Sequence, residues 1–474
     1  MSPTRPDRNA RIAIVGAGPG GLSAAWFLKA NGYRNVTVLE KEGRIGGLCL
    51  SITENYQTYD IGANYVTMEY VETLKIAKTV GAKLYFEAPY TGLHVPQDGG
   101  PTRFTDILTT IRTDEATGKV VPILRYMRLA LKYLRLRLKL GPVIDPPTFA
   151  RVVEDAPELA VPFSQWLASH GLEPLSRLFE IPVTIMGYGH LNEIAAPYVL
   201  KYIGPRTFVP MLFFSVPVLR HLLPWPKRFV EGYARMWERV SWGLDVRLNV
   251  DIASITRTDG GVTIKFSEDE QILARERRFP SEMAFDYLIL ACPLAPAVTE
   301  KFLDLGNTER DVLARIKTNT YTMFTATVKG LDLPTPIAVV FPQTPTGTPW
   351  GVTQQFKSKG SLVTQFYLQL PGSGAVAPPD EHFRETCRKA CQDLVRRMGG
   401  TIESEMTAWQ TFDAFPYFQH VTIEDFGAGW YARLEALQGA NRTCYVGGAT
   451  NFELIEPIVR HSKHVVNTHF PPVT

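Results

Sequence analysis

The sequence lacks the features that mark membrane proteins, metal-stapled proteins and common hydrolases. No stretch approaches the roughly 20 apolar residues of a membrane-spanning helix, and the first ten residues lack the apolar core of a signal peptide. The five cysteines form no CxxC pair, so we expect neither a structural zinc site nor a disulfide framework. GxSxG and HExxH motifs are also missing, which argues against a serine hydrolase and a zinc protease. We therefore expect a cytoplasmic protein without a metal site.

A strong net charge is missing as well. The chain has 474 residues and a formal net charge of +3, with 20% charged and 45% hydrophobic residues. A global field this weak does not attract nucleic acid, so we expect no nucleic-acid partner. The length allows two or three domains. No repeat or low-complexity segment is visible, and no pattern indicates an oligomeric state.

Strand and helix patterns are clearest in three separated parts of the chain. Near the start, "RIAIVGAG" and "VTVLE" have the pattern of buried strands around the helical "GLSAAWFLKANGY". In the middle, "DIASITRTDGGVTIKF" alternates as a hairpin and "FDYLILACP" is a buried strand. At the end, "TCYVGGAT" predicts a strand and "EPIVRHSKHVVNTHF" a helix. We predict one nucleotide-binding domain from residues 1–85, 235–300 and 435–474. Residues 86–234 and 301–434 form an inserted α+β substrate domain, mostly helical over 105–234.

The first strand and helix enclose a GxGxxG motif. Gly16 permits a tight turn, Gly18 lets the backbone approach a pyrophosphate, and Gly21 allows close packing of the strand and the helix. Glu40 ends the second strand, where a carboxylate can accept both ribose hydroxyls. These residues alone allow either NAD or FAD.

The residues that follow distinguish the two cofactors. The run "GAGPGGLSAAWFLKANGYRNVTVLEKEGRIGG", with "YDIGANY" after it, resembles the extended signature of the flavin amine oxidase and protoporphyrinogen oxidase superfamily. The resemblance implies an α/β fold with a discontinuous Rossmann-type FAD-binding domain. It also implies FAD contacts by Gly16, Gly18, Pro19, Gly20, Gly21, Glu40, Lys41, Arg44, Gly46, Gly47, Leu48, Gly62, Ala63, Asn64, Val250, Gly448, Ala449, Pro457 and Ile458. Within that set, Val250 stands where backbone groups meet adenine, and the amides around Ile458 face the flavin.

One position departs from the superfamily pattern. Members carry a Gly-Glu pair in the last strand-to-helix turn, and the carboxylate holds a ribityl hydroxyl. Here "YVGGAT" places Gly448 where the acid is expected. That hydroxyl therefore needs another partner in this chain.

Four segments of the second domain resemble the bacterial FAD-dependent polyunsaturated fatty acid isomerases. They are "PFSQWLASHGL", "GYGHLNEIAAPYVLKY", "FPYFQHVTIEDFGAGWYARLEALQG" and "HSKHVV". The resemblance implies a redox-neutral reaction in which a hydride leaves an allylic methylene for flavin N5 and returns to another carbon. A small lipid is then the substrate. A net oxidase or desaturase acting on an apolar or amine substrate is the alternative, and a membrane-attached binding module is the third reading.

A lipid of this kind needs an apolar tunnel. The segment "TFVPMLFFSVPVLRHLLPWP" is apolar but interrupted by prolines, so we predict a loop that lines a cavity or touches a membrane. Phe208, Phe213, Phe214 and Trp225 are candidates for the lining, with core packing as the alternative. The segment "LYFEAPYTGLHV" holds no basic residue for a fatty acid carboxylate, which leaves Lys201, Arg206 or a basic helix to meet it.

Two further features have open interpretations. "GYGH" offers Tyr188 and His190 as candidate catalytic residues, although hydride transfer at N5 requires no general base. We expect Tyr188 to position the flavin or the lipid at the cavity wall, with plain structural packing and proton transfer by His190 as the alternatives. Residues 119–140 predict a basic amphipathic helix, which suits peripheral contact with an anionic membrane or a solvated face over a packed one.

Overall fold

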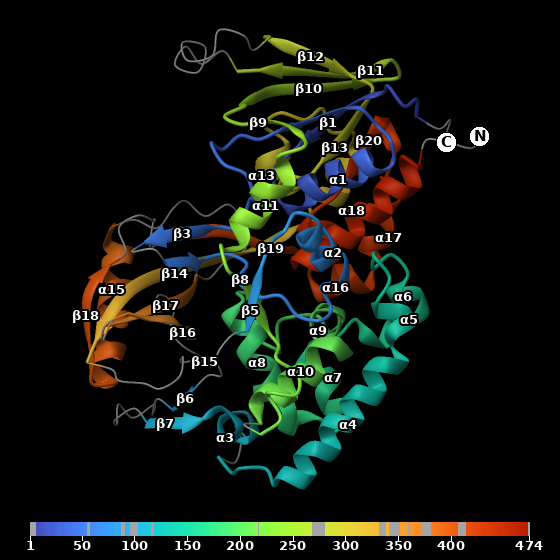
Figure 1. Ribbon diagram of the computed structural model, residues 1–474. Coiled ribbons are helices and arrows are strands. Elements are labelled where there is room, and N and C mark those ends of the chain that lie inside the picture. Colours follow the sequence, from blue (N-terminus) through green and yellow to red (C-terminus); the bar gives the residue numbers. More distant parts are fainter. Residues whose placement is uncertain are drawn as a thin grey trace.

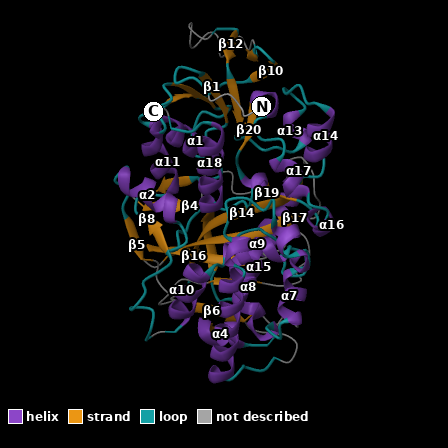
Figure 2. Ribbon diagram, turned by 90° about the vertical axis from the view of Figure 1, so that its right-hand side faces the viewer, coloured by secondary structure: helices purple, strands orange, loops and turns teal. Residues whose placement is uncertain are grey.

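The computed structural model describes residues 6–54, 57–86, 91–94, 103–114, 118–216, 218–267, 280–330, 338–340, 351–358, 361–370, 381–405 and 414–472. Three regions are visible in Figures 1 and 2. A layered α/β region holds both ends of the chain. A long antiparallel sheet lies beside its lower edge, and a group of helices lies at the opposite end of the molecule.

The α/β region is built on a five-stranded parallel sheet. Its strands run in the order β20 (Thr443–Tyr445), β13 (Tyr287–Leu290), β1 (Arg11–Val15), β2 (Asn35–Leu39) and β9 (Asp245–Arg247). Ile14 pairs with Val38 on one side and with Ile289 on the other, and all three side chains are fully buried. Strands from all three predicted segments of the nucleotide-binding domain therefore lie in one sheet. This α/β arrangement confirms the predicted fold class. The domain boundaries themselves stay predictions.

Helices α1 (Pro19–Ala30) and α18 (Ile455–His469) pack against each other beside this sheet. Helix α1 follows the first strand directly, and α18 follows the last strand through a short loop. Both helix starts therefore lie near the carboxyl ends of the strands, where open α/β sheets bind ligands. Helices α2 (Val71–Thr79) and α11 (Tyr233–Ser241) contact α18 and α1, respectively. In Figure 2, α13 (Pro296–Thr299), α14 (Asn307–Leu313) and α17 (Trp430–Glu435) lie on the other side of the parallel sheet, and α16 (Ile423–Gly427) contacts α17.

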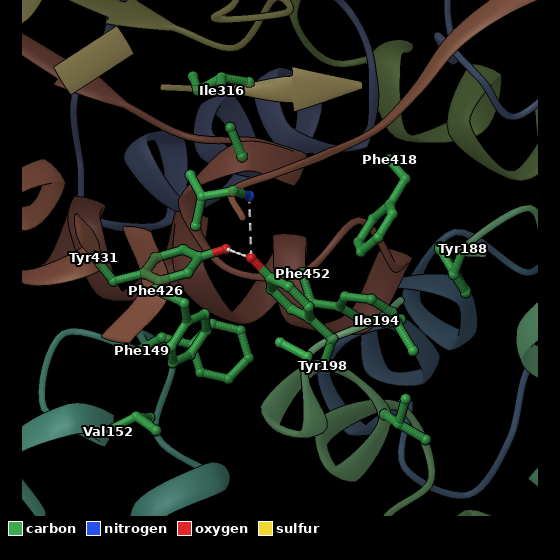
Figure 3. Close-up of a cluster of buried hydrophobic side chains, with 14 of the residues drawn as sticks. Phe149, Val152, Tyr188, Ile194, Tyr198, Ile316, Phe418, Phe426, Tyr431 and Phe452 are labelled. Carbon is green, nitrogen blue, oxygen red and sulfur yellow. Dashed lines mark hydrogen bonds between the residues drawn. The ribbon is translucent and has the colours of Figure 1, made fainter. Parts of the chain in front are cut away.

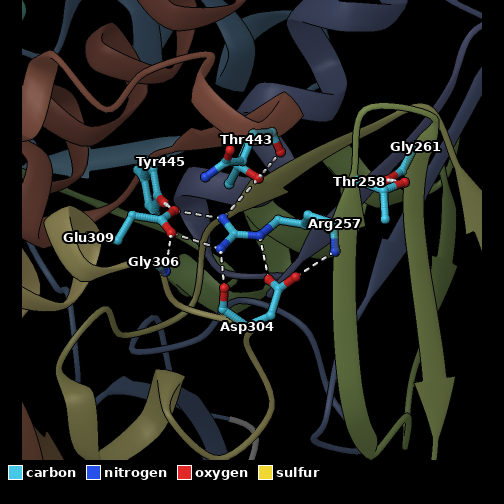
Figure 4. Close-up of polar contacts among 9 residues, drawn as sticks. Arg257, Thr258, Gly261, Asp304, Gly306, Glu309, Thr443 and Tyr445 are labelled. Atoms are coloured by element: carbon cyan, nitrogen blue, oxygen red, sulfur yellow. Dashed lines mark hydrogen bonds and ion pairs between the residues drawn. The ribbon is translucent and has the colours of Figure 1, made fainter.

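A three-stranded antiparallel sheet adjoins the parallel one. It contains β10 (Ile252–Thr258), β11 (Gly261–Phe266) and β12 (Glu282–Phe285), and the first two form the predicted hairpin. Arg257 of β10 is buried and connects this sheet to its neighbours (Figure 4). Its guanidinium binds both carboxylate oxygens of Glu309 at 2.6 and 2.8 Å, and its Nε donates to Asp304 at 2.6 Å. Its Nη1 also donates to the Thr443 hydroxyl at 3.3 Å, which links β10 to β20.

The second large sheet is antiparallel and has six strands. Its order is β15 (Ala338–Val340), β16 (Gly351–Ser358), β17 (Ser361–Leu370), β14 (Lys317–Lys329) and β18 (Thr401–Glu405), and β19 (Ala414–His420) also pairs with β14. Helix α15 (Glu381–Arg397) covers it near β18. The described residues also form three two-stranded sheets. These pair β3 (Ser51–Glu54) with β4 (Gln57–Asp60), β5 (Leu84–Phe86) with β8 (Lys227–Phe229), and β6 (Thr91–His94) with β7 (Arg103–Asp106).

The helical region lies at the far end of the molecule from the parallel sheet (Figure 1). It contains α3 (Ile107–Arg112), α4 (Ile123–Lys139), α5 (Gly141–Ile144), α6 (Val152–Asp155), α7 (Phe163–Ser169), α8 (Ser176–Ile185), α9 (Ala196–Tyr202) and α10 (Pro205–Ser215). Helix α4 is the predicted basic helix. In the described part of the chain, no helix is both long and apolar enough to cross a membrane.

The segment predicted as a loop at 207–226 begins instead as a helix. Helix α10 runs through Pro210 to Ser215, and irregular backbone follows. Pro205 occupies the first turn, where its missing N–H costs nothing. Pro210 costs one intrahelical hydrogen bond. Pro210 and its neighbours Phe208 and Phe214 are buried. Packing on both sides of the helix therefore compensates for the lost hydrogen bond.

Candidate functional site

The glycine-rich turn forms a cradle at the start of α1. Gly18 is the N-cap residue and provides no side chain to cap the helix, and Pro19 follows at the first position. A Cβ atom placed on Gly18 would lie 3.8 Å from the Cα of Gly47, so two glycine backbones face each other there. The uncapped amides at a helix start attract an anion, and the bare backbones leave room for it.

The carboxylate of Glu40 is fixed at the end of β2. Its Oε2 accepts the Ala17 N–H at 2.7 Å, and its Oε1 accepts the Glu42 N–H at 2.9 Å. Each oxygen keeps a second lone pair for a ribose hydroxyl. The Val250 N–H donates to the backbone oxygen of Glu40 at 2.8 Å, which leaves the Val250 carbonyl as its remaining backbone group. These residues lie together, as the sequence predicts.

The second predicted glycine segment also lies beside this turn. The Gly46 N–H donates to the Ala17 oxygen at 2.9 Å, and Arg44 Nη1 donates to the Gly47 oxygen at 2.8 Å, while Lys41 is exposed. Gly62 packs so closely on the Leu48 carbonyl that a Cβ would come within 1.6 Å of its oxygen. Asn64 is only 5% exposed, and its Oδ1 has no hydrogen-bond partner in the described structure.

The cradle, the fixed carboxylate and the unpartnered Asn64 oxygen together fit a bound dinucleotide. A buried amide oxygen without a partner is costly unless a ligand or water satisfies it. Gly18 and Gly47 lie within contact distance of each other, and neither places a side chain at the start of α1. The residues present therefore fit a bound FAD.

The last strand-to-helix turn contains a carboxylate that the sequence pattern does not reveal. A Cβ on Gly448 would lie 2.8 Å from Cγ and 2.9 Å from Cδ of Glu453. Glu453 thus occupies the space of the side chain that Gly448 lacks. Its Oε2 accepts the Gln419 N–H at 2.6 Å. Burial raises the pKa of Glu453 to about 7, although hydrogen bonds from the backbone of Gln419 and Phe418 oppose the rise.

This raised pKa predicts a pH-dependent stability. Between pH 4.5 and 7 the unfolded chain loses the Glu453 proton but the folded chain retains it, so stability falls as the pH rises through this window. Glu453→Gln keeps an acceptor for Gln419 and removes the titration. Relative to that of the wild type, the free energy of unfolding of the variant should rise by up to about 3 kcal/mol between pH 5 and pH 7.5. Urea unfolding at both pH values measures this, with the exposed Glu158→Gln as control. An equal pH response in wild type and Glu453→Gln would refute the assignment.

Tyr188 is part of a buried aromatic cluster beside this turn (Figure 3). Its hydroxyl donates to the Glu453 backbone oxygen at 2.8 Å, and its ring lies 4.8 Å from that of Phe452. The Tyr198 and Tyr431 hydroxyls share a hydrogen bond of 2.8 Å, and Tyr431 also donates to the Asn451 oxygen at 3.0 Å. Burial raises the pKa of Tyr188 well above its usual value. The cluster holds the loop that carries Glu453, and Tyr188 lines neither of the two cavities described below.

His190 lies in the adjoining turn and faces a different partner. Its Nδ1 lies 2.9 Å from Oε1 of Glu180, and 24% of its side chain is exposed. Gly187 has a φ of +77°, and a Cβ there would meet the Tyr321 ring at 2.7 Å. This position therefore requires glycine, because the turn packs closely against β14. His190 lines neither cavity, so acid–base catalysis by it has no support in this arrangement.

An apolar cavity of about 150 Å³ lies among α3, α8 and α10. Phe214 and Trp225 line it, and their contact with a substrate stays a prediction. Phe208 does not line it, because it lies on another face of α10 and packs 4.4 Å from Tyr133 in the core. Phe213 is not in the lining either. The remaining wall comes from Tyr65, Thr67, Ile107, Ile111, Leu178, Ile181, Pro182, Ile185, Met186, Tyr202, Thr207, Pro210, Met211, Ser215 and Pro226.

Most of this lining was missed by the sequence reasoning. Leu178, Ile181 and Ile185 recur at helical spacing on α8, and Thr207, Met211 and Phe214 do so on α10. This periodicity indicates buried faces, but it does not say which faces enclose a cavity and which fill a core. The described residues contain no group of three or more side chains suited to a metal ion.

The fold and the site together define a dinucleotide-binding α/β protein with an apolar cavity. Comparison with known proteins makes this specific. Residues 19–451 match the model of the flavin containing amine oxidoreductase family, so the chain belongs to that family. Its cofactor is therefore FAD, and the predicted superfamily is confirmed.

Several relatives carry more specific names. The crystal structure of a CLA-producing fatty acid isomerase from P. acnes matches at a TM-score of 0.78 and 25% identity, covering 98% of this chain and 99% of that one. A polyenoic fatty acid isomerase of Ptilota filicina is 24% identical over 52% of this chain, and the match spans only about half (51%) of that relative. An FAD-dependent oxidoreductase of Apiospora sacchari is 25% identical over 92% of this chain and 88% of its own length. A putrescine oxidase structure, at 15% identity and a TM-score of 0.64, shares the fold.

Proposed function

We propose that this protein is an FAD-dependent double-bond isomerase of a long-chain polyunsaturated fatty acid or a related lipid. The apolar cavity is the observation that carries the proposal. Its described lining holds no carboxylate, ammonium or guanidinium group, so it suits a hydrocarbon chain and offers no counter-ion to an amine. The likeness to two proteins named as fatty acid isomerases supports the same substrate class.

When bound, FAD supplies hydride acceptance and hydride return at N5. The side chains of the protein position the substrate and exclude water from it. Ile181, Met211 and Phe214 exclude water from the hydrocarbon, which protects a cationic reaction centre from addition of water. Tyr202 is also part of the cavity wall.

We further propose which residues hold the cofactor. The turn from Gly16 to Gly21 and the Gly46–Gly47 pair bind the pyrophosphate, and Glu40 binds the adenosine ribose. Glu453 takes the ribityl hydroxyl that the Gly448 position leaves without a carboxylate. Gly448→Glu should clash with Glu453 and weaken FAD binding, and Glu453→Gly added to it should restore binding. FAD dissociation constants measured by flavin fluorescence test this, and a double variant no better than the single one would refute it.

The isomerase assignment has a direct test. The purified holoenzyme, incubated anaerobically with a panel of polyunsaturated fatty acids and their esters, should produce conjugated-diene absorbance. Under air, product should form without equivalent consumption of O2. Consumption of one O2 per product, with peroxide, would show a net oxidase or desaturase and sink the isomerase proposal.

We infer in addition a peripheral contact with anionic lipid through α4. This helix buries Tyr126, Ala130 and Tyr133 and exposes Leu124, Leu131 and Leu138, which are seven residues apart and therefore share a face. Five basic side chains are exposed along the same helix: Arg125, Arg128, Lys132, Arg135 and Lys139. Exposed leucines beside basic side chains suit an anionic membrane surface, because the membrane buries the leucines and its charge neutralises the arginines and lysines.

The helix gives a simple binding prediction. Leu131→Gln removes one buried leucine from the membrane contact, which is worth about 1.5–3 kcal/mol, so partitioning onto phosphatidylglycerol vesicles should fall about tenfold or more. Co-sedimentation measures it, with the exposed Leu248→Gln as a matched control. Phosphatidylcholine vesicles should bind more weakly. Equal partitioning of both variants and the wild type would contradict the contact.

A further inference from the structure

A second, polar cavity lies beside the apolar one. It has a volume of about 30 Å³. Tyr202 lines both cavities. Glu69 lines the polar cavity and donates its N–H to the hydroxyl of Thr67, which lines the apolar one. The two cavities therefore share a wall formed by the residues around 67–69 and by the end of α9.

Two buried side chains in the polar cavity each have one polar atom without a hydrogen-bond partner in the described structure. Arg137 is 1% exposed, and its Nη1 has no hydrogen-bond acceptor in the described structure. Asn451 is also 1% exposed, and its Oδ1 has no donor there. Other bonds fix both side chains in place. Arg137 Nε donates to the Leu200 oxygen at 2.7 Å, and Asn451 Nδ2 donates to the Pro147 oxygen at 2.6 Å. Such groups are costly when buried, unless a ligand or water meets them.

The polar groups of the cavity that remain available to a ligand are mostly hydrogen-bond donors. Arg460 lines it, and its guanidinium donates no hydrogen bond to any residue that the structure describes. Lys201 uses one N–H for the Pro146 oxygen at 2.5 Å. Burial and the charges of Arg460 and Arg137 hold the pKa of Lys201 well below its usual range, although Asp145 opposes this. A bound anion would relieve that repulsion.

The acidic groups around the cavity are largely occupied. Asp145 pairs with Arg137. Glu456 accepts the N–H groups of Glu72 and Thr73, both at 2.9 Å. Glu69 accepts the Arg206 N–H at 2.9 Å, and burial raises its pKa. Repulsion from these acids is therefore reduced by pairing or by the raised pKa, while several donors stay free.

We propose that this polar cavity binds the carboxylate end of the unsaturated chain whose hydrocarbon fills the apolar cavity. The inference rests on the proposed lipid substrate. A volume of about 30 Å³ holds roughly two or three oxygen-sized groups at 10–15 Å³ each, which suits the two oxygens of a carboxylate. Arg137 and Arg460 donate to these oxygens, and Asn451 accepts from the protonated form or from water. Arg206, the other predicted partner, is exposed and lines neither cavity.

Binding of the chain is measurable without turnover, because Trp225 lies in the apolar wall. Quenching of tryptophan fluorescence in the holoenzyme gives the dissociation constants of stearic acid and of its methyl ester, whose saturated chains have no allylic methylene and therefore do not turn over. The wild type should prefer the acid. Arg460→Gln should weaken acid binding about tenfold and leave the ester unchanged, since a charge-assisted hydrogen bond is lost. Arg137→Lys should act in the same direction, and the exposed Arg151→Gln should behave as wild type.

Three outcomes would decide the proposal. A lower acid-to-ester preference in Arg460→Gln and Arg137→Lys supports it, even if no isomerisation occurs, so failure of the proposed reaction is distinguishable from failure of this site. An unchanged preference in both variants, with normal FAD content and melting temperature, overturns it. Competition by acetate with an unchanged acid-to-ester preference would assign the cavity to a small free carboxylate and overturn the lipid assignment.

Discussion

Gly18→Asp should abolish FAD binding and leave the rest of the fold intact. A Cβ at this position meets only the Cα of Gly47, at an ordinary contact distance of 3.8 Å, so the protein itself tolerates a side chain. We place the pyrophosphate beside these two glycines, at the start of α1. A carboxylate there fills the cradle and repels an anion at the start of α1. We expect FAD affinity to fall more than about 100-fold, which corresponds to the loss of two charge-assisted contacts.

Flavin absorbance per mole of purified protein and FAD titration of the apoprotein measure this loss. Gly260→Asp is the matched control, because Gly260 lies in the β10–β11 turn and a Cβ there meets only the Thr258 hydroxyl at 3.6 Å. A yellow Gly18→Asp protein with wild-type flavin content would show that the cradle does not hold the pyrophosphate.

Arg257→Met should cause the largest loss of stability. Arg257 and Glu309 side chains are only 2% and 4% exposed, and the bidentate pair is completed by Asp304 and by the Tyr445 hydroxyl. Although burial alone would raise it, the pKa of Glu309 lies below its ordinary value because Arg257 and Tyr445 bind the carboxylate. Removing one partner of a buried pair leaves an uncompensated charge, which costs about 3–5 kcal/mol.

Urea unfolding of the holoenzyme measures the change in free energy. Arg310→Met is the control, since Arg310 and its partner Glu300 are 52% and 44% exposed and such surface pairs contribute about 0–1 kcal/mol. Equal losses in the two variants would mean that the Arg257 cluster does not hold the two sheets together.

Much of the α/β region was predictable because its signals are local. The strand patterns at Arg11–Val15 and Asn35–Leu39 and the helical pattern between them follow from short-range periodicity. The reading of 207–226 as a loop was wrong at its start, because α10 continues through Pro210. The sequence shows the cost of that proline, but the tertiary packing that compensates for it is not a local property.

The cavities depend on contacts that no local pattern shows. Phe208 and Phe214 look alike in the sequence, yet one fills the core and the other lines the apolar cavity. Glu453 replaces a side chain five residues earlier, which only the folded loop reveals. Arg137 was hidden in a basic amphipathic pattern that we read as surface, although its side chain is buried against Leu200 and Asp145. Lys201, which the sequence offers as a partner for a carboxylate, lines the polar cavity, and that role stays a prediction.

The central claim, a redox-neutral isomerisation, is tested most directly by counting turnovers per FAD in the absence of oxygen or any other electron acceptor. The holoenzyme is mixed anaerobically with a large excess of a polyunsaturated fatty acid, and the product is quantified by its conjugated-diene absorbance. We expect many equivalents of product per FAD and a flavin that is oxidised again when the substrate is spent. Product that stops at one equivalent per FAD, with the flavin left reduced, would contradict it.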